Sequence, residues 1–433
     1  MSRLRGYNLV KGIVNLVSRF PLASRVAEAL PRDRCVVVAF GKSAYRMIEP
    51  VEDGGVTVEG GIVVVPHGYT GRRPPGMEVV EASHPVPDEA SLRAGRAVLE
   101  WARASRSVGC LLALISGGGS ALVEYPMDPI TLEDVRAINR LLLASGASIH
   151  EINTVRKHIS LVKGGRLAGE AYPARVYGLY ASDVPGDRID SIASGPTAPD
   201  PTTYRDALDV LERYGITGEA PERVVKVLRE GVEGKRPETP KPGSEVFERV
   251  SNSVVAANID VLKSIGDLLR GKGINPLILT SRLEGESREA GRVLASITME
   301  AVDRGIPVGR TSAILAGGET SVRVRNPNGR GGRNMELAVS WAHAMWYWGY
   351  RDEAIIVSLD TDGIDGNTDA AGAYMAPGDV DTAKSLGLDP VKALDENNTY
   401  KLLEELGRLV KTGPTQVNLN SVTVILVGPP GEA

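Results

Sequence analysis

Lys42 stands in the first segment whose composition could support chemistry, the tripeptide Gly41-Lys42-Ser43. It follows an apolar run at residues 36–40, so we expect a strand-to-helix turn, where backbone N–H groups and the helix dipole favour an anion. The segment is not a complete P-loop, because Val36 occupies the position of the leading glycine. Lys42 is therefore a candidate for holding phosphate or carboxylate, and an ordinary surface lysine is the alternative.

A glycine triplet flanked by two serines, Ser116-Gly117-Gly118-Gly119-Ser120, follows a second apolar run at residues 111–115. Adjacent glycines allow several N–H groups to converge on one oxygen atom, and the two hydroxyl groups are further donors. This composition indicates a cradle for phosphate or carboxylate. The same triplet also makes a flexible turn, which is the alternative.

Two aspartates, Asp183 and Asp187, follow a third apolar run at residues 176–181, and the segment continues to Ser194-Gly195-Pro196-Thr197. Carboxylates at the end of a strand can hold a metal ion or accept the proton of a hydroxyl group. Aspartate is also frequent in turns because its side chain bonds the nearby backbone, so a purely structural role carries equal weight.

The second half of the chain combines glycines, carboxylates and an arginine in Gly317-Gly318-Glu319-Thr320, residues 329–334 around Arg333, and the acidic run 360–366. The acidic run is not an EF-hand, because its glycine is displaced and no glutamate closes the loop. Carboxylates beside glycine-rich loops suit Mg²⁺-nucleotide chemistry, in which an arginine or lysine offsets charge in the transition state.

Each of these segments follows a predicted strand, and apolar runs alternate with amphipathic stretches along most of the chain. The alternation predicts an α/β fold with two lobes, each a largely parallel sheet flanked by helices. The stretch 231–245 is rich in Gly, Pro and charge, which predicts domains at 1–235 and 246–433. Strands are expected at 36–40, 62–65, 111–115, 176–181, 254–258, 276–280, 313–316, 354–359 and 422–427, and helices at 89–103 and 131–144, the second opened by a capping box of Thr131 and Asp134.

Length and charge narrow the class of protein. A chain of 433 residues favours two or three domains, at about 150 residues each. The 50 Lys and Arg against 54 Asp and Glu give a net charge of −4, which excludes a global basic field for nucleic acid or an anionic membrane. The apolar runs fall far short of the roughly 20 residues that cross a bilayer, so we expect a cytoplasmic protein. Gln416 is the only glutamine, a scarcity that favours a thermophilic source.

Cysteine, histidine and glycine patterns exclude two common kinds of site. Cys35 and Cys110 each open an apolar run without a Cys/His metal pattern, so we expect buried, reduced thiols. The five histidines lack the spacing of zinc ligands. No Gly-x-Gly-x-x-Gly follows the first strand, so the usual nicotinamide fingerprint is missing.

Taken together, the ordered motifs resemble the glycerate 2-kinase family with the C-terminal region called MOFRL, some members of which have been labelled hydroxypyruvate reductases. The resemblance covers nearly the whole chain. It is carried by residues 41–44, 83–88, 116–122, 155–158, 163–168, 182–187, 194–197, 316–320, 331–334, 360–366 and 412–415.

The resemblance implies transfer of the γ-phosphoryl group of ATP to the 2-hydroxyl of D-glycerate, with Mg²⁺ or another divalent cation, in a cleft between two lobes. It implies that Lys42 and Arg333 are catalytic, and Asp183 or Asp187 is our candidate acceptor for the hydroxyl proton. The expected partners are D-glycerate and ATP, without nucleic acid or membrane, for a monomer or homodimer. Expected substrate or phosphate-binding residues are Ser43, Ser116, Gly117, Gly118, Gly119, Ser120, Lys157, Thr197, Gly317, Gly318, Asn334 and Asn418, and expected metal ligands are Glu319, Asp360 and Asp362.

Two positions depart from the family pattern, with Ser421 in place of an acidic residue and Met335 in place of a glutamine. Three other functions are alternatives: a kinase acting on the 3-hydroxyl or on another small hydroxy acid, a hydroxypyruvate reductase using NAD(P)H, and a non-catalytic anion-binding protein. The missing dinucleotide fingerprint weighs against the reductase.

Overall fold

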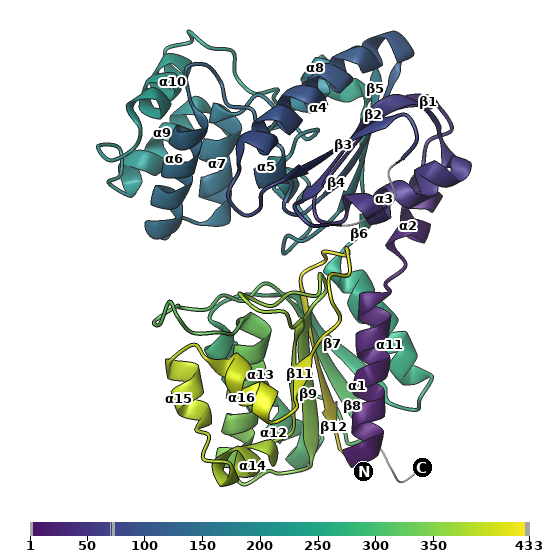
Figure 1. Cartoon of the computed structure of the whole chain (residues 1–433), viewed down its shortest axis with the longest axis vertical. Coiled ribbons are helices and arrows are strands. Elements are labelled where there is room, and N and C mark those ends of the chain that lie inside the picture. Colours follow the sequence, from purple (N-terminus) through teal and green to yellow (C-terminus); the bar gives the residue numbers. More distant parts are fainter. Residues whose placement is uncertain (1–2, 70, 72–73, 429–433) are drawn as a thin grey trace. The chain divides into compact units, whose positions relative to one another are not determined.

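The computed structural model describes residues 3–69, 71 and 74–428, and the chain separates into two compact units (Figure 1). Residues 21–182 and 187–256 form one, which we call the parallel-sheet unit. Residues 1–20, 183–186 and 257–433 form the other, which we call the mixed-sheet unit. Both combine a sheet with flanking helices, so the predicted two-part α/β architecture is confirmed.

The parallel-sheet unit has the strand order β3-β2-β1-β4-β5-β6, and every neighbouring pair is parallel. The central strands are buried on both faces, which is why they read as continuous apolar runs rather than as alternating patterns. The strands are β1 (Arg34–Phe40), β2 (Thr57–Pro66), β3 (Met77–Ala82), β4 (Cys110–Ser116), β5 (Arg175–Ala181) and β6 (Val250–Ala256).

The helices of this unit begin at strong capping signals. The predicted box of Thr131 and Asp134 opens α6, and Asp88, Ser148 and Thr203 cap α4, α7 and α9 in the same way. Helices α6, α7, α9 and α10 share one apolar cluster. The helices are α2 (Leu22–Ala29), α3 (Ala44–Pro50), α4 (Glu89–Val108), α5 (Gly119–Leu122), α6 (Leu132–Ala144), α7 (Ile149–Ile159), α8 (Arg166–Ala171), α9 (Tyr204–Arg213) and α10 (Glu222–Val232).

The two cysteines form a disulfide, and the expectation of reduced thiols was wrong. Cys35 and Cys110 lie at the beginnings of β1 and β4, which are neighbours in the sheet, and their Cα atoms are 4.6 Å apart. The sequence shows that each cysteine opens a strand. It does not show which strands become neighbours, and that pairing brings the two sulfur atoms together.

We expect removal of this disulfide to destabilise the parallel-sheet unit. The bond joins residues 75 positions apart, and a cross-link that closes a loop of this size stabilises a folded chain by about 2–4 kcal/mol, largely by restricting the unfolded state. The variant C35A/C110A should therefore unfold at a lower denaturant concentration than the oxidised protein, as measured by circular dichroism. Equal midpoints for the variant and the oxidised protein would contradict this assignment.

The mixed-sheet unit has the strand order β11-β10-β9-β12-β8-β7. Strands β7, β8, β9 and β11 run in one direction, and β10 and β12 run in the other. The last described strand, β12, lies between β8 and β9, so β7–β8 is the only parallel pair among the described strands of this sheet. The strands are β7 (Asn275–Leu283), β8 (Ser312–Gly318), β9 (Ala354–Asp360), β10 (Gly372–Met375), β11 (Leu409–Val410) and β12 (Ser421–Val427).

Helix α13 packs on this sheet, and its apolar side joins a core cluster that includes Trp341 and Met345. Met335 is fully buried in the same cluster. The position at which the family pattern has a glutamine is therefore part of the apolar core in this protein. The helices are α1 (Arg3–Ser18), α11 (Asn258–Arg270), α12 (Ser287–Arg304), α13 (Arg333–Tyr347), α14 (Asp379–Ser385), α15 (Pro390–Asp395) and α16 (Thr399–Glu405).

The units divide the chain differently from the predicted domains at 1–235 and 246–433. The Gly- and Pro-rich stretch before residue 245 is an internal loop, because the chain then adds β6 to the edge of the parallel sheet. Helix α1 belongs to the mixed-sheet unit, where it packs against α11. A break in apolar periodicity marks a long loop as readily as a domain boundary, and this explains the difference.

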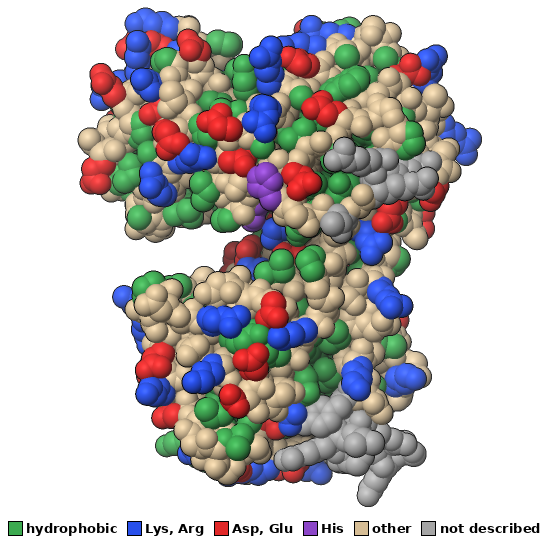
Figure 2. All heavy atoms as spheres, viewed as in Figure 1, with side chains coloured by type: hydrophobic (Ala, Val, Ile, Leu, Met, Phe, Trp, Pro, Cys, Tyr) green, Lys and Arg blue, Asp and Glu red, His purple; other side chains and the backbone are tan. Residues whose placement is uncertain are grey.

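Charged side chains of both signs are interspersed over the visible faces of both units (Figure 2). This distribution agrees with the near balance of acidic and basic residues in the sequence. In the described part of the chain, no helix has the length and apolarity needed to span a membrane.

Candidate active-site residues

In the parallel-sheet unit, the two predicted anion-binding segments lie side by side. They follow β1 and β4, which are neighbours, so their loops meet at the carboxyl edge of the sheet. The backbone N–H of Lys42 donates to the carbonyl of Gly117 at 2.9 Å, and the N–H of Ser43 donates to Oγ of Ser116 at 3.0 Å. These bonds join residues 41–43 and 116–120 into one structure, which we call the glycine-loop cluster.

Glycine is required in this cluster for steric reasons. Gly41 has a φ of 120°, and a Cβ there would lie 2.2 Å from Oγ of Ser116. A Cβ on Gly118 would lie 3.2 Å from Cγ of Lys42 and 3.1 Å from Cδ2 of His84. The Lys42 side chain and the His84 ring therefore flank the glycine triplet, which puts a positive charge beside a loop rich in N–H groups.

A strained segment contacts the glycine-loop cluster from residues 193–195. Ala193 and Ser194 have φ values of 50° and 61°, which are uncommon for residues other than glycine. Oγ of Ser194 lies 2.8 Å from Oγ of Ser120 and donates to Oδ1 of Asn153 at 3.0 Å. The sequence places Ser194 in a motif but gives it no role there, and it does not indicate Asn153, since no local signal marks a helical asparagine as a partner.

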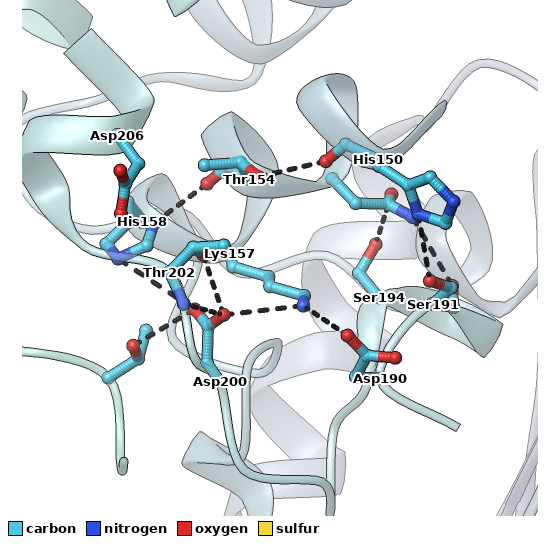
Figure 3. Close-up of polar contacts among 12 residues, drawn as sticks. His150, Thr154, Lys157, His158, Asp190, Ser191, Ser194, Asp200, Thr202 and Asp206 are labelled. Atoms are coloured by element: carbon cyan, nitrogen blue, oxygen red, sulfur yellow. Dashed lines mark hydrogen bonds and ion pairs between the residues drawn. The ribbon is translucent and has the colours of Figure 1, made fainter. Parts of the chain in front are cut away.

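Lys157 lies in a buried ionic network rather than at an open binding site (Figure 3). Its Nζ is 3.4 Å from Oδ1 of Asp200 and 3.7 Å from Oδ2 of Asp190. Asp200 also accepts bonds from Thr202 and Thr239, so its carboxylate is fully engaged. The substrate or phosphate-binding role predicted for Lys157 does not fit this position, because the amine already has two anionic partners.

The predicted binding role of Thr197 does not fit the structure either. Its hydroxyl is fully buried, bonds Tyr180 at 2.6 Å and donates to Oδ1 of Asn252 at 2.7 Å. Thr197 therefore ties β5 to β6 in the interior of the unit. Its place in a Gly-Pro-Thr motif reflects packing at this point.

In the mixed-sheet unit, Arg333 bridges two of the predicted acidic residues. Its Nη1 donates to Oε1 of Glu319 at 2.7 Å, and its Nε donates to Oδ2 of Asp360 at 3.2 Å, with a further bond from Nη2. Glu319 follows β8, Asp360 ends β9 and Arg333 begins α13, so three elements bring these residues together. We call them the arginine cluster.

The charges of this cluster are interdependent. Burial lowers the pKa of Arg333, but the charges of Asp360 and Glu319 outweigh it, and the pKa is raised overall. The guanidinium therefore stays cationic beside a buried carboxylate. Ser421 lies opposite Asp360 in the sheet and donates to its Oδ2 at 3.3 Å, so this departure from the family pattern places a neutral donor where a second acid would repel Asp360.

Asp365 holds the beginning of α13 and thereby positions Arg333. It is fully buried, and its two carboxylate oxygens accept the backbone N–H groups of Asn334 and Met335 at 3.2 and 2.9 Å. A Cβ on Gly332 would lie 2.3 Å from the Asp365 carboxyl carbon, so only glycine fits there. Asp365 belongs to the acidic run of the sequence, but its role is not visible there, because its partners lie 30 and 31 residues earlier.

Asn334 supports the same structure. Its Nδ2 donates to Asp365 at 3.2 Å and to Ser421 at 3.0 Å, and its Oδ1 accepts from Ser358 at 2.8 Å. The amide of Asn334 thus bonds within the sheet and helix, and the binding role predicted for it stays a prediction.

We expect the stability of the protein to depend on pH through Asp365. Burial raises the pKa of Asp365 to about 7, against the opposing backbone N–H bonds, while the unfolded carboxyl titrates near 4. Folding is therefore favoured by this group below pH 4, and that contribution is lost as pH rises to 7. Urea unfolding of the protein and of Asp365→Asn at pH 4.5 and 7.5 measures the effect. The protein should lose stability relative to the variant as pH rises, and a gain would show that the charged carboxylate is the stabilising form.

The predicted metal ligands Glu319, Asp360 and Asp362 do not form a ready site. No group of three His, Cys, Asp or Glu side chains suited to a metal ion occurs among the described residues. Arg333 pairs with Glu319 and Asp360, and Oδ1 of Asp362 accepts the N–H of Ile364 at 3.0 Å. One observation favours a ligand, because Oδ1 of Asp360 is buried without a hydrogen-bond partner. A single vacant oxygen beside a guanidinium does not make a cation site.

The remaining candidates are divided between the two units. Asp183 belongs to the mixed-sheet unit, where its Oδ2 accepts from Nδ2 of Asn418 at 2.9 Å. Asp187 belongs to the parallel-sheet unit and has a φ of 57°. Gly317 and Gly318 allow close packing, because a Cβ on either would lie within 2.3 Å of the atoms of Asn258 or Leu283.

These features define a protein of two α/β units, each with a positively charged residue at a loop or helix start beside the carboxyl ends of its strands. Two family models match the chain: DUF4147, a domain of unknown function, at residues 7–229, and MOFRL at residues 312–421. The chain belongs to the glycerate 2-kinase family of the MOFRL type, as the motifs predicted.

Three relatives illustrate the range of names in this family. A D-glycerate 2-kinase of Thermotoga maritima is 43% identical, with 93% of each chain covered. A glycerate 2-kinase of Pyrococcus horikoshii is 41% identical, covering 92% of this chain and 88% of the relative. A protein of Agrobacterium vitis, named provisionally as a hydroxypyruvate reductase, is 44% identical, covering 92% of this chain and 88% of the relative.

The structure is similar to a crystal structure of glycerate kinase from Thermotoga maritima, with a TM-score of 0.85 and 41% identity. That match covers 97% of this chain and 99% of the other. A protein structure from Pyrococcus horikoshii matches with a TM-score of 0.79 and 38% identity, covering 98% of each chain.

Proposed function

We propose that this protein is a glycerate 2-kinase, which transfers the γ-phosphoryl group of ATP to the 2-hydroxyl of D-glycerate. The observation that carries the proposal is the direct hydrogen bond that joins Lys42 to the glycine triplet, in a chain that is more than 40% identical to two glycerate 2-kinases. A lysine beside converging N–H groups suits the anionic oxygens of a carboxylate or a phosphoryl group.

In this proposal each unit contributes residues with a role of their own. Lys42 and the N–H groups of residues 117–119 hold anionic oxygens and offset the charge that develops during transfer. Arg333 supplies a second fixed positive charge, oriented by Glu319 and Asp360. Asp183 or Asp187 accepts the proton of the attacking hydroxyl. Much of the rate enhancement then comes from positioning, since the transferring group is held in line with that hydroxyl.

We propose ATP as the donor, with a divalent cation carried on its phosphates. We assign none of the chain's own residues to that cation and no step to a cation held by the protein, because Arg333 already engages two of the three expected ligands, Glu319 and Asp360. We further propose a cytoplasmic enzyme from a thermophilic source that acts as a monomer or homodimer.

An assay coupled to enolase tests the reaction and its regiochemistry together. Enolase accepts 2-phosphoglycerate but not the 3-isomer, so we expect phosphoenolpyruvate to form from ATP and D-glycerate. The reductase alternative, which is also the provisional name of the Agrobacterium vitis relative, predicts oxidation of NAD(P)H by hydroxypyruvate without ATP. Oxidation of NAD(P)H without any phosphorylated product would overturn the kinase proposal. Product that appears only with a 3-phosphoglycerate assay would move the reaction to the other hydroxyl.

A further inference from the structure

A buried chain of polar side chains connects the glycine loop to helix α7. Ser120, at the end of the glycine triplet, is partly exposed, whereas Ser194 and Asn153 behind it are buried. Oγ of Ser120 is 2.8 Å from Oγ of Ser194, which is 3.0 Å from Oδ1 of Asn153. Figure 3 shows Ser194 and Ser191 next to each other at this end of the network. The chain therefore runs from a ligand-facing loop into the interior.

The geometry fixes the direction of each hydrogen bond. Nδ2 of Asn153 donates to the carbonyl of Ser191 at 3.4 Å, which orients the amide so that Oδ1 faces Ser194. An amide oxygen only accepts, so the single hydroxyl proton of Ser194 is given to Asn153. In the contact between the two serines, Ser194 must then be the acceptor. Ser120 therefore donates its own proton to Ser194.

The hydroxyl of Ser194 is held in place by a strained backbone segment. Ser194 has a φ of 61° and follows Ala193 at 50°, so two residues other than glycine are held in the left-handed region. Such strain persists where the surrounding structure imposes it, and it is concentrated at functional sites. Gly119 packs against Ala193, since a Cβ there would lie 2.9 Å from the Ala193 Cβ. The strained segment thus fits directly under the glycine loop.

Because the hydroxyl proton of Ser120 is donated to Ser194, the Ser120 hydroxyl can only accept a hydrogen bond from a ligand. The surrounding loop supplies N–H donors and the Lys42 charge, which recognise anionic oxygens. Ser120 is the exception, because its one hydroxyl proton is used in the contact with Ser194 and its Oγ is left with lone pairs only. This corrects the expectation from sequence that Ser120 is an extra donor. A ligand group that meets Ser120 must itself donate a proton.

We propose that Ser120 accepts a hydrogen bond from a substrate hydroxyl that keeps its proton, and that Ser194 and Asn153 are positioning residues for this contact. The reacting hydroxyl is not a candidate, since it must give up its proton to a base and a serine oxygen is not one. The proposal rests on the proposed function, in which the remaining group is the 3-hydroxyl of D-glycerate. Ser120 thus selects a dihydroxy acid over the same acid without that hydroxyl.

Binding of D-glycerate and D-lactate, measured by calorimetry, tests the proposal, because D-lactate differs by lacking this one hydroxyl. We expect the protein to bind D-glycerate more tightly. In Ser120→Ala the preference should fall by about tenfold, the size expected for one neutral hydrogen bond. Ser194→Ala and Asn153→Leu should reduce the preference in the same direction, and Ser194→Ala should have little further effect in a Ser120→Ala background.

Two comparisons distinguish a loss of the Ser194 hydroxyl from a general disturbance of the fold. Ser194→Gly removes the same hydroxyl but relieves the backbone strain, so equal loss of preference in the Gly and Ala variants assigns the effect to the hydroxyl. Ser105, whose hydroxyl is buried and bonds within α4, is the matched control, and Ser105→Ala should leave the preference unchanged.

The binding measurement decides the inference without turnover. Equal weakening of both acids in Ser120→Ala, or no preference in the unmodified protein, would overturn it. If the protein prefers D-glycerate through Ser120 but forms no phosphorylated product, the inference stands and the kinase proposal fails.

Discussion

The variant Lys42→Ala should lower kcat by about 10²-fold or more, the range seen when one preorganised charge or donor is removed from an active site. The side chain of Lys42 lies against Gly118, the middle residue of the glycine triplet. Its loss removes positive charge from the point where we place anionic oxygens. The enolase-coupled assay at saturating ATP and D-glycerate measures the change.

The fold should survive this substitution, because the bond that joins the two loops uses the backbone N–H of Lys42 rather than its amine. Lys226, an exposed lysine of α10 in the same unit, is the matched control, and Lys226→Ala should retain full activity. Lys42→Arg should recover part of the rate, since it restores charge with a different shape. An unchanged kcat in Lys42→Ala would remove this residue from the mechanism.

Replacement of Arg333 should affect both rate and stability. In Arg333→Met the fixed positive charge is lost, and we expect kcat to fall by about 10²- to 10³-fold. The buried Asp360 is then left without its cation, which should cost about 2–3 kcal/mol of folding free energy. The kinase assay and denaturant unfolding measure the two effects separately.

A second substitution distinguishes catalysis from stability. Arg333→Met combined with Asp360→Asn removes the unpaired charge, so stability should recover while activity stays low. Recovery of activity along with stability would show that Arg333 serves the fold alone. Arg333→Lys should remain impaired, because an ammonium cannot reproduce the forked contact with Glu319 and Asp360.

The sequence predicted the local parts of this structure well. Lys42, the glycine triplet and Glu319 lie just after strands, and Asp360 ends one, as their apolar flanks indicated. These signals are local, because a buried strand and the glycine-rich turn after it are formed by consecutive residues. The family motifs then indicated which loops belong to one protein.

The features that the sequence did not reveal depend on pairings between distant residues. Asp365 caps α13 from 30 residues away, and the disulfide depends on which strands become neighbours. The direction of β12 follows from where the last strand inserts, which apolar periodicity does not encode. The hydroxyl of Ser120 donates to Ser194 because Ser194 donates to Asn153. This direction is known only once the orientation of the Asn153 amide is known. The sequence indicates which loops could bind anions. Only the side-chain geometry of the structure shows which groups in those loops donate and which accept hydrogen bonds.

Helix α1 has a consequence for how the protein is made. Its apolar residues Val10, Ile13 and Val17 are buried in the same unit as α11, which begins only at Asn258. A ribosome that adds about 5–20 residues per second needs roughly 10–50 s to reach that point. Helix α1 must therefore wait through the synthesis of the parallel-sheet unit before its hydrophobic side is covered, and during that interval it is a natural target for a chaperone.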